Sequence, residues 1–176
     1  MQRLAARVRA GARRLLPRNH MLLLANAGGA TWLADVGFGA EGPLSPIPFG
    51  TGEEVRQGPW SYRVVPEGED AGLWVLQSRL DEAWVDLYAF SREPQEQIDY
   101  EVVSYYTSTH PDSPFVHTLT AQTASREERR ILRGRELLFD RGTAVTRRTI
   151  ADDDELLAVL GEVFGLPFPP GTRFRC

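Results

Sequence analysis

Two short apolar runs separated by a pair of glycines place the strongest constraint on how this sequence folds. Residues 19–26 (NHMLLLAN) and 31–36 (TWLADV) are rich in apolar residues, and Gly28 and Gly29 stand between them. Glycine readily adopts the positive φ angles that a tight two-residue turn requires. The pattern therefore predicts a β-hairpin, in which the two runs pair as neighbouring antiparallel strands.

More strand-like stretches follow the hairpin. They lie at residues 60–65, 72–79 and 83–90, and turn-forming residues separate them. The intervening segment 37–52 is rich in glycine and proline and is expected to be an irregular loop. Several short strands at this spacing favour an antiparallel barrel or sandwich.

The pattern changes after residue 92. Apolar residues at helical spacing predict a helix over 94–106 that begins at Pro94. Beyond it we expect strands at 115–121, 136–139 and 142–149, and a final helix at 152–164. The predicted fold class is α+β: an antiparallel β-barrel over residues 1–92, followed by a small α/β unit over residues 93–176.

Composition excludes several classes of function. The 176 residues are 42% hydrophobic and 25% charged, as in ordinary globular proteins, and the net charge of −4 gives no reason to expect a nucleic-acid partner. No apolar run approaches the ~20 residues that a membrane span needs. The single cysteine, Cys176, excludes an internal disulfide, which fits a cytoplasmic chain. No cluster of His, Cys and acidic residues has zinc-ligand spacing, so no metal is expected.

Two polar residues lie in the predicted hairpin. His20 begins the first run and Asp35 lies near the end of the second. If the runs pair, the imidazole and the carboxylate approach each other, and a buried Asp would fix the tautomer of the His ring. Such a pair supports a catalytic nucleophile. On spacing alone, a structural or surface His and an Asp in a turn are the commoner interpretations.

Several longer motifs carry a family resemblance. The runs HMLLL and WLADVGFG resemble the core of the arylamine N-acetyltransferase family, and so do RLAARVR, VVSYYTSTHPDSPF and ELLAVLGEVFGLPF. They occur in the family's order over nearly the whole chain. The resemblance implies a helical first domain similar to that of cysteine proteases, a β-barrel second domain, and an α/β third domain that acts as a lid.

The resemblance also assigns residues. His20 and Asp35 match the His and Asp of the family's Cys-His-Asp triad. Phe38 and Phe115 are implied as lining residues of the acyl and aryl pocket. The resemblance further implies that three glycines lie near bound coenzyme A: Gly37, Gly39 and Gly42.

One part of the family pattern is missing. The family's nucleophilic cysteine lies in an Arg-Gly-Gly-X-Cys motif of the helical domain, and no such run occurs in these residues. Cys176 follows FPPGTRFR, and nothing adjacent marks a helix start that would activate its thiol. Either the full chain starts upstream of Met1 or this is a truncated homologue, and in both cases we expect these 176 residues to be inactive without the domain that carries the cysteine.

The implied activity is acyl transfer from acetyl-CoA to an aromatic amine or hydrazine. The alternatives are an amide synthase of antibiotic biosynthesis with the same triad, and a non-catalytic remnant that binds coenzyme A or a partner chain. A β-rich binding module with a structural His and Asp is disfavoured by the motif matches. The apolar surface left by the missing domain, Phe38 included, predicts self-association.

Overall fold

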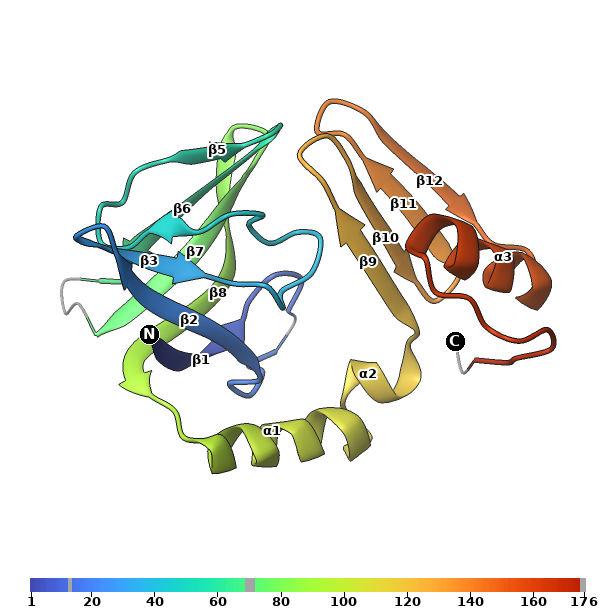
Figure 1. The fold of residues 1–176 in the computed structure, drawn as a ribbon, viewed down its shortest axis with the longest axis horizontal. Helices are drawn as coiled ribbons and strands as arrows, with labels where there is room; N and C mark the ends of the chain where they lie inside the picture. Colours follow the sequence, from blue (N-terminus) through green and yellow to red (C-terminus); the bar gives the residue numbers. More distant parts are fainter. Residues whose placement is uncertain (13, 69–71, 175–176) are drawn as a thin grey trace. The chain divides into compact units, whose positions relative to one another are not determined.

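The chain divides into two compact units, Met1–Tyr105 and Tyr106–Cys176, in a computed structural model that describes residues 1–12, 14–68 and 72–174 (Figure 1). The division falls within helix α1 (Gln97–Thr109), whereas the sequence pattern changes after residue 92. Cys176 lies outside the described residues. Across the described ranges, no helix combines the length and apolar character that a membrane crossing needs.

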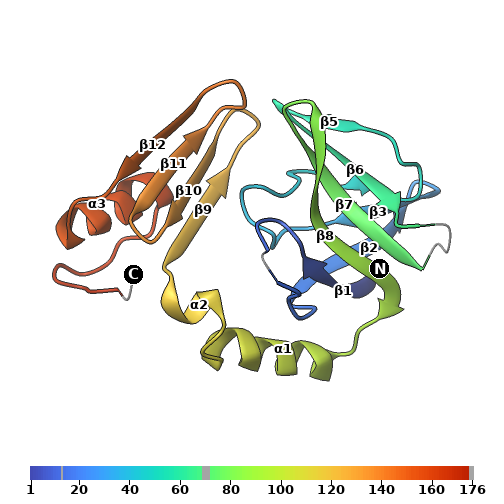
Figure 2. The ribbon, with the colours of Figure 1, turned by 180° about the vertical axis from the view of Figure 1, so that it is seen from behind.

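An eight-stranded antiparallel sheet forms the first unit (Figure 1; from behind in Figure 2). The strand order is β4-β3-β2-β1-β8-β7-β6-β5, and β4 also contacts β6, so the sheet curls into a nearly closed barrel. The strands are β1 (Gln2–Val8), β2 (His20–Ala27), β3 (Ala30–Ala34), β4 (Ile47–Pro48), β5 (Val55–Gln57), β6 (Trp60–Pro66), β7 (Leu73–Leu80) and β8 (Ala83–Pro94).

The barrel is filled by the inward-facing residues of its strands. Because side chains alternate across a strand, every second residue of β1, β2 and β8 enters this core. Its fully buried members include Leu4, Leu22, Leu33, Ile47, Tyr62, Leu76, Tyr88 and Phe90.

The turn between β2 and β3 sets the position of the site. Gly28 and Gly29 have φ angles of +59° and +77°, as a two-residue hairpin turn of the primed type requires. The register pairs Leu24 with Leu33. Continuing that register places Asp35 opposite Leu22, on the inner face of the barrel.

The second unit is a four-stranded antiparallel sheet packed against one helix. The sheet order is β12-β11-β10-β9. Buried side chains of β10, β11 and α3 form its core, among them Leu132, Leu137, Leu156 and Leu160. The elements are β9 (Thr120–Ala124), β10 (Arg129–Arg133), β11 (Glu136–Asp140), β12 (Val145–Thr149) and α3 (Asp153–Phe164), preceded by the short helix α2 (Pro114–His117).

The predicted α+β class and antiparallel barrel are confirmed, and the expected strands of the barrel all occur. Three local expectations were wrong. Pro94 ends β8 instead of opening a helix, and α1 begins at Gln97. The expected strand at 115–121 begins as α2, because Pro114 at its first position is preset for a helix. The expected loop at 37–52 contains β4.

Three further strands, β1, β5 and β10, were not predicted. β10 reads RRILR, and its charged residues obscure the apolar alternation. Arg129 is nevertheless buried, and it lies 3.6 Å from the Asp140 carboxylate of the neighbouring strand β11. Tertiary pairing therefore places a charge-rich segment inside the sheet.

Replacing Asp152 tests how α3 is held. The Asp152 carboxylate accepts a hydrogen bond from the backbone N–H of Glu155 (2.9 Å), and this bond caps the first turn of the helix. Asp152→Ala should lower the free energy of unfolding by about 0.5–2 kcal/mol, measured by urea denaturation. Asp154→Ala removes an exposed charge from the same turn without removing the cap and is the matched control. Equal losses in the two variants would contradict the capping role.

Candidate active site

His20, at the start of β2, and Asp35, just after the end of β3, meet on the inner face of the barrel. The Nε2 atom of His20 lies 2.6 Å from Oδ2 of Asp35, although 15 residues separate them in the chain. The His20 side chain is 10% exposed and that of Asp35 is fully buried. Both follow from the hairpin register, since His20 lies two residues before Leu22 on the same face and is a diagonal neighbour of Asp35.

The second oxygen of Asp35 is held by the backbone that follows it. Oδ1 accepts hydrogen bonds from the N–H groups of Gly37 (2.9 Å) and Phe38 (3.1 Å). Burial acts to raise the pKa of Asp35, but the hydrogen bond and charge of His20, with the Gly37 N–H and the Tyr88 hydroxyl, outweigh it. The pKa of Asp35 therefore lies below its ordinary value, and the carboxylate stays ionised.

Two aromatic rings enclose the imidazole. The Phe38 ring meets the His20 ring edge-on at a centroid distance of 5.3 Å, and the Tyr88 ring lies at 4.9 Å. Phe38 and Tyr88 also contact each other, at 5.3 Å. Phe38 is half-buried and packs on the barrel core. The rings limit water around the His20–Asp35 pair, which strengthens the interaction between them.

Tyr88 is a site residue that the sequence analysis missed. It is fully buried, and burial followed by the nearby charge of Asp35 raises its pKa well above the ordinary value. Its hydroxyl lies near the carboxylate but makes no regular hydrogen bond to any described residue. In the sequence, Tyr88 is a single tyrosine in an apolar strand pattern, and that pattern does not indicate which residues it contacts.

The three glycines assigned by the resemblance differ in their surroundings. At Gly37 a Cβ atom would lie 3.9 Å from Cε1 of His20, so glycine leaves space beside the imidazole edge. Gly39 has a φ of +98°, which favours glycine. At Gly42 a Cβ would lie 3.0 Å from the Cβ of Phe38, so this glycine permits the loop to close on Phe38.

Phe115 lies in α2 of the other unit, and its side chain is 67% exposed. Its contact with the acyl pocket remains a prediction. Among the residues that the structure describes, no three His, Cys, Asp or Glu side chains gather as metal ligands do.

The arrangement is suited to moving one proton. If Nε2–H donates to Asp35, the lone pair of His20 lies on Nδ1, the ring nitrogen that can accept a proton from a nucleophile. The buried carboxylate then stabilises the imidazolium that forms. A His–Asp pair of this kind serves a separate nucleophile, which must lie within reach of Nδ1.

Comparison with known proteins identifies the family. A family model described as N-acetyltransferase matches residues 1–171. The arylamine N-acetyltransferase of Mycobacterium tuberculosis is 35% identical over 154 residues, which are 86% of this chain and 53% of that protein. The corresponding enzyme of Escherichia coli is 34% identical over 161 residues, covering 86% of this chain and 54% of that protein.

The fold agrees with solved structures. The arylamine N-acetyltransferase of Mycobacterium abscessus superposes with a TM-score of 0.87 at 31% identity, covering 96% of this chain and 61% of that one. The Mycobacterium marinum enzyme in complex with CoA gives a TM-score of 0.84 at 32% identity, covering 94% and 62%. The chain thus spans about half the length of the curated relatives it matches. With the fold, the order of its motifs and the family model in agreement, this chain belongs to the arylamine N-acetyltransferase family.

Proposed function

We propose that this chain supplies the His and Asp of a Cys-His-Asp site that transfers an acetyl group from acetyl-CoA to an aromatic amine or hydrazine. The observation that carries the proposal is the 2.6 Å contact between His20 Nε2 and Asp35 Oδ2 in a chain of this family. The nucleophilic thiol would come from outside these 176 residues, whose one cysteine is Cys176. The likeness to an enzyme solved in complex with CoA supports the choice of donor.

His20 would act twice. It first takes the proton of the thiol at Nδ1, and the thiolate attacks the acetyl carbonyl. The imidazolium then returns that proton to the departing thiol of coenzyme A, which leaves an acetylated cysteine. In the second half His20 accepts a proton from the attacking amine and gives it to the cysteine sulfur as the amide forms. Asp35 stays ionised throughout and holds the ring in one tautomer.

The surroundings of the pair suit an apolar acceptor. Phe38 offers a partly exposed ring beside the imidazole, and an aromatic amine would stack against it, while the buried Tyr88 ring closes the other side of the imidazole. The open space at Gly37 leaves the imidazole edge accessible to the donor's acyl end. We keep Gly39 and Gly42 as backbone of the loop that would lie along coenzyme A, and Phe115 as a further pocket residue.

Transfer activity tests the proposal. The 176-residue chain alone should transfer no acetyl group from acetyl-CoA to 4-methoxyaniline, because it lacks the nucleophile. Fusion behind the part of the M. tuberculosis relative that it does not match should restore transfer. In that fusion His20→Ala should reduce kcat/KM by about 10²–10⁴-fold. His117→Ala, at an exposed histidine of α2, is the matched control and should leave the rate unchanged.

The outcomes separate the alternatives. Robust turnover by the chain alone, abolished by His20→Ala, would contradict the need for an external cysteine. A folded fusion that binds coenzyme A without transfer would favour the non-catalytic remnant. Transfer from bulky acyl donors in preference to acetyl-CoA would favour the amide synthase.

The ionised state of Asp35 predicts how stability depends on pH. Folding lowers the pKa of Asp35. The stability that its ionised carboxylate adds to the fold is therefore complete above the unfolded pKa of about 3.9, and it is lost as pH falls through the folded pKa. Asp35→Asn should therefore cost about 1–3 kcal/mol at pH 7, and the difference from wild type should shrink below about pH 4. Urea unfolding at both pH values measures this. Asp154→Asn, at an exposed carboxylate, should change little, and a loss for Asp35→Asn that is equal at both pH values would contradict the argument.

We also propose that the chain self-associates, and we place the interface on α1, because Phe38, expected to be uncovered by the missing domain, is half-buried against the barrel core. Ile98, Val102 and Tyr105 lie on one face of this helix, at i, i+4 and i+7, and their side chains are 62%, 65% and 72% exposed. Sedimentation velocity should show dimers or larger species that dissociate on dilution, and Ile98→Gln with Val102→Gln should give a monomer. Leu80→Gln, at an isolated residue that is 63% exposed, is the control. A monomeric wild type at high concentration would exclude this interface.

A further inference from the structure

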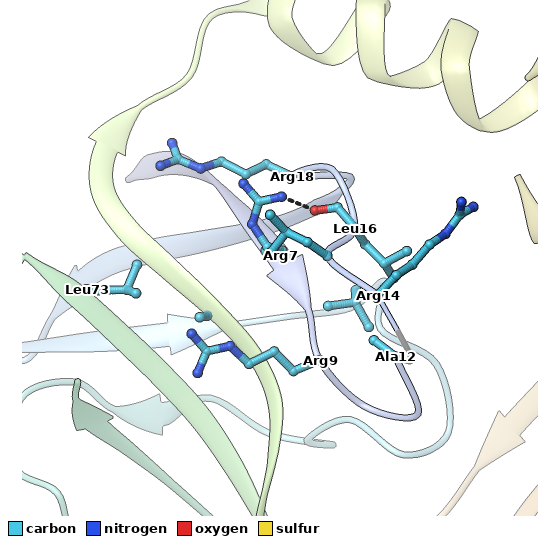
Figure 3. A pocket seen from close by; sticks show the side chains of 10 residues that line it. Arg7, Arg9, Ala12, Arg14, Leu16, Arg18 and Leu73 are labelled. Atoms are coloured by element: carbon cyan, nitrogen blue, oxygen red, sulfur yellow. Dashed lines mark hydrogen bonds between the residues drawn. The ribbon is translucent and has the colours of Figure 1, made fainter. Parts of the chain in front are cut away.

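A cavity lined by arginine lies beside the loop that joins β1 to β2 (Figure 3). Its volume is about 490 Å³, and all of its lining residues belong to the first unit. Four of them are Arg7, Arg9, Arg14 and Arg18. We call it the arginine cavity.

The arginine cavity shares no lining residue with the His20–Asp35 pair or the rings around it. Arg7 of β1 pairs with Ala89 of β8, and both line the cavity. The next pair along the strands is Val8 with Tyr88, and Tyr88 packs against His20 inside the barrel. Because neighbouring residues of a strand point to opposite faces, Arg7 and Ala89 lie on the outer face. Val8, the partner of Tyr88, also lines the cavity, so the cavity extends from the outer face to the end of β1, but none of His20, Asp35, Phe38 and Tyr88 lines it.

The lining carries positive charge and no carboxylate. The ten described residues that line the cavity include four arginines and no Asp or Glu. Arg9 is held by two carboxylates that do not line the cavity. It donates two hydrogen bonds to Glu67, at 2.6 and 2.8 Å, and one to Asp86, at 2.9 Å.

The guanidinium groups of Arg7 and Arg18 are less fully neutralised than that of Arg9. Arg7 donates to the backbone carbonyl of Leu16, a neutral partner that leaves its charge in place. Arg18 lies 3.1 Å from Glu93, but both side chains are largely solvated, so this ion pair is weak. In Figure 3 the guanidinium of Arg14 points away from the other three, so we assign it no role in the site.

We propose that the arginine cavity binds a phosphate monoester, with the phosphoryl oxygens held by Arg7 and Arg18, while Arg9, paired with two carboxylates, takes no direct part. Guanidinium groups form paired hydrogen bonds with phosphate oxygens, and each retains several N–H donors after the contacts above. The apolar side chains of Leu73 and Ala89 line the same cavity and offer a surface for the organic part of the ligand. This site goes beyond the proposed acetyl transfer and does not depend on it.

Calorimetric titration of the whole chain tests the site. The probes are inorganic phosphate and phenyl phosphate at constant ionic strength, since exposed ionic contacts weaken with salt. Both should bind saturably with a stoichiometry of one, and phenyl phosphate should bind more tightly if the apolar wall is used. Equal affinities would assign the site to free phosphate. Tighter binding of benzoate than of phenyl phosphate, or no saturable binding of either phosphate, would overturn the proposal.

Variants locate the binding. Arg7→Gln and Arg18→Gln should each weaken phenyl phosphate by about tenfold, because each removes a charged donor. Arg79→Gln, which breaks a comparable exposed ion pair with Glu54 away from the cavity, is the matched control and should bind as wild type does. Ala89→Leu keeps every charge but fills the cavity, and it should weaken phenyl phosphate more than inorganic phosphate. Melting curves confirm that each variant folds, and unchanged binding in both Arg18→Gln and Ala89→Leu would overturn the site.

Discussion

The register of the β2–β3 hairpin is the constraint on which the site depends. The two-residue turn at Gly28 and Gly29 closes the hairpin with Ala27 opposite Ala30, and every later pair follows from that closure. A slip of one residue would move a whole set of side chains to the other face of the sheet. Asp35 would then point outward, and no local adjustment of His20 could restore their contact. Turn chemistry, set by the positive φ angles of two glycines, thus brings the Asp35 carboxylate into contact with a histidine fifteen residues earlier in the chain.

The buried carboxylate of Asp35 is stable because each of its oxygens has a donor. An ionised group in the protein interior is costly unless it is paired and hydrogen-bonded. His20 satisfies one oxygen, and the N–H groups of Gly37 and Phe38 satisfy the other. The same Phe38 then turns its ring onto the imidazole, so one short segment both anchors the carboxylate and covers its partner. The pair is therefore held in its geometry before any substrate arrives, which is the condition for efficient proton transfer.

The sequence predicted features that depend on neighbouring residues better than features that depend on contacts between distant segments. The hairpin followed from turn residues and strand patterns that lie close together in the chain, and the resemblance to the family singled out His20 and Asp35 within it. Tyr88 reaches the site through the pairing of β1 with β8, between segments about eighty residues apart, and no local pattern carries that information. β10 was missed because the arginines of RRILR obscure its apolar pattern. Its pairing with β9 and β11, on both sides, is what makes it a strand. The wrong strand prediction next to Pro114 had a local cause. Proline is favourable in the first turn of a helix and unfavourable in a central strand, so it indicated a helix there.

One pair of strands carries two kinds of chemistry because its residues alternate between faces. On the inner face, Tyr88 of β8 meets the His20 ring in an apolar core where a charged pair is strong. On the outer face, the neighbouring positions Arg7 and Ala89 border a cavity rich in guanidinium groups. A change at Arg7 alters the outer face without moving Tyr88, whereas a change in strand register would exchange the faces and damage both. The inner face carries the proposed His–Asp pair, whereas the proposed acetyl transfer makes no use of the arginines on the outer face. The arginine cavity therefore calls for an explanation in terms of its own ligand.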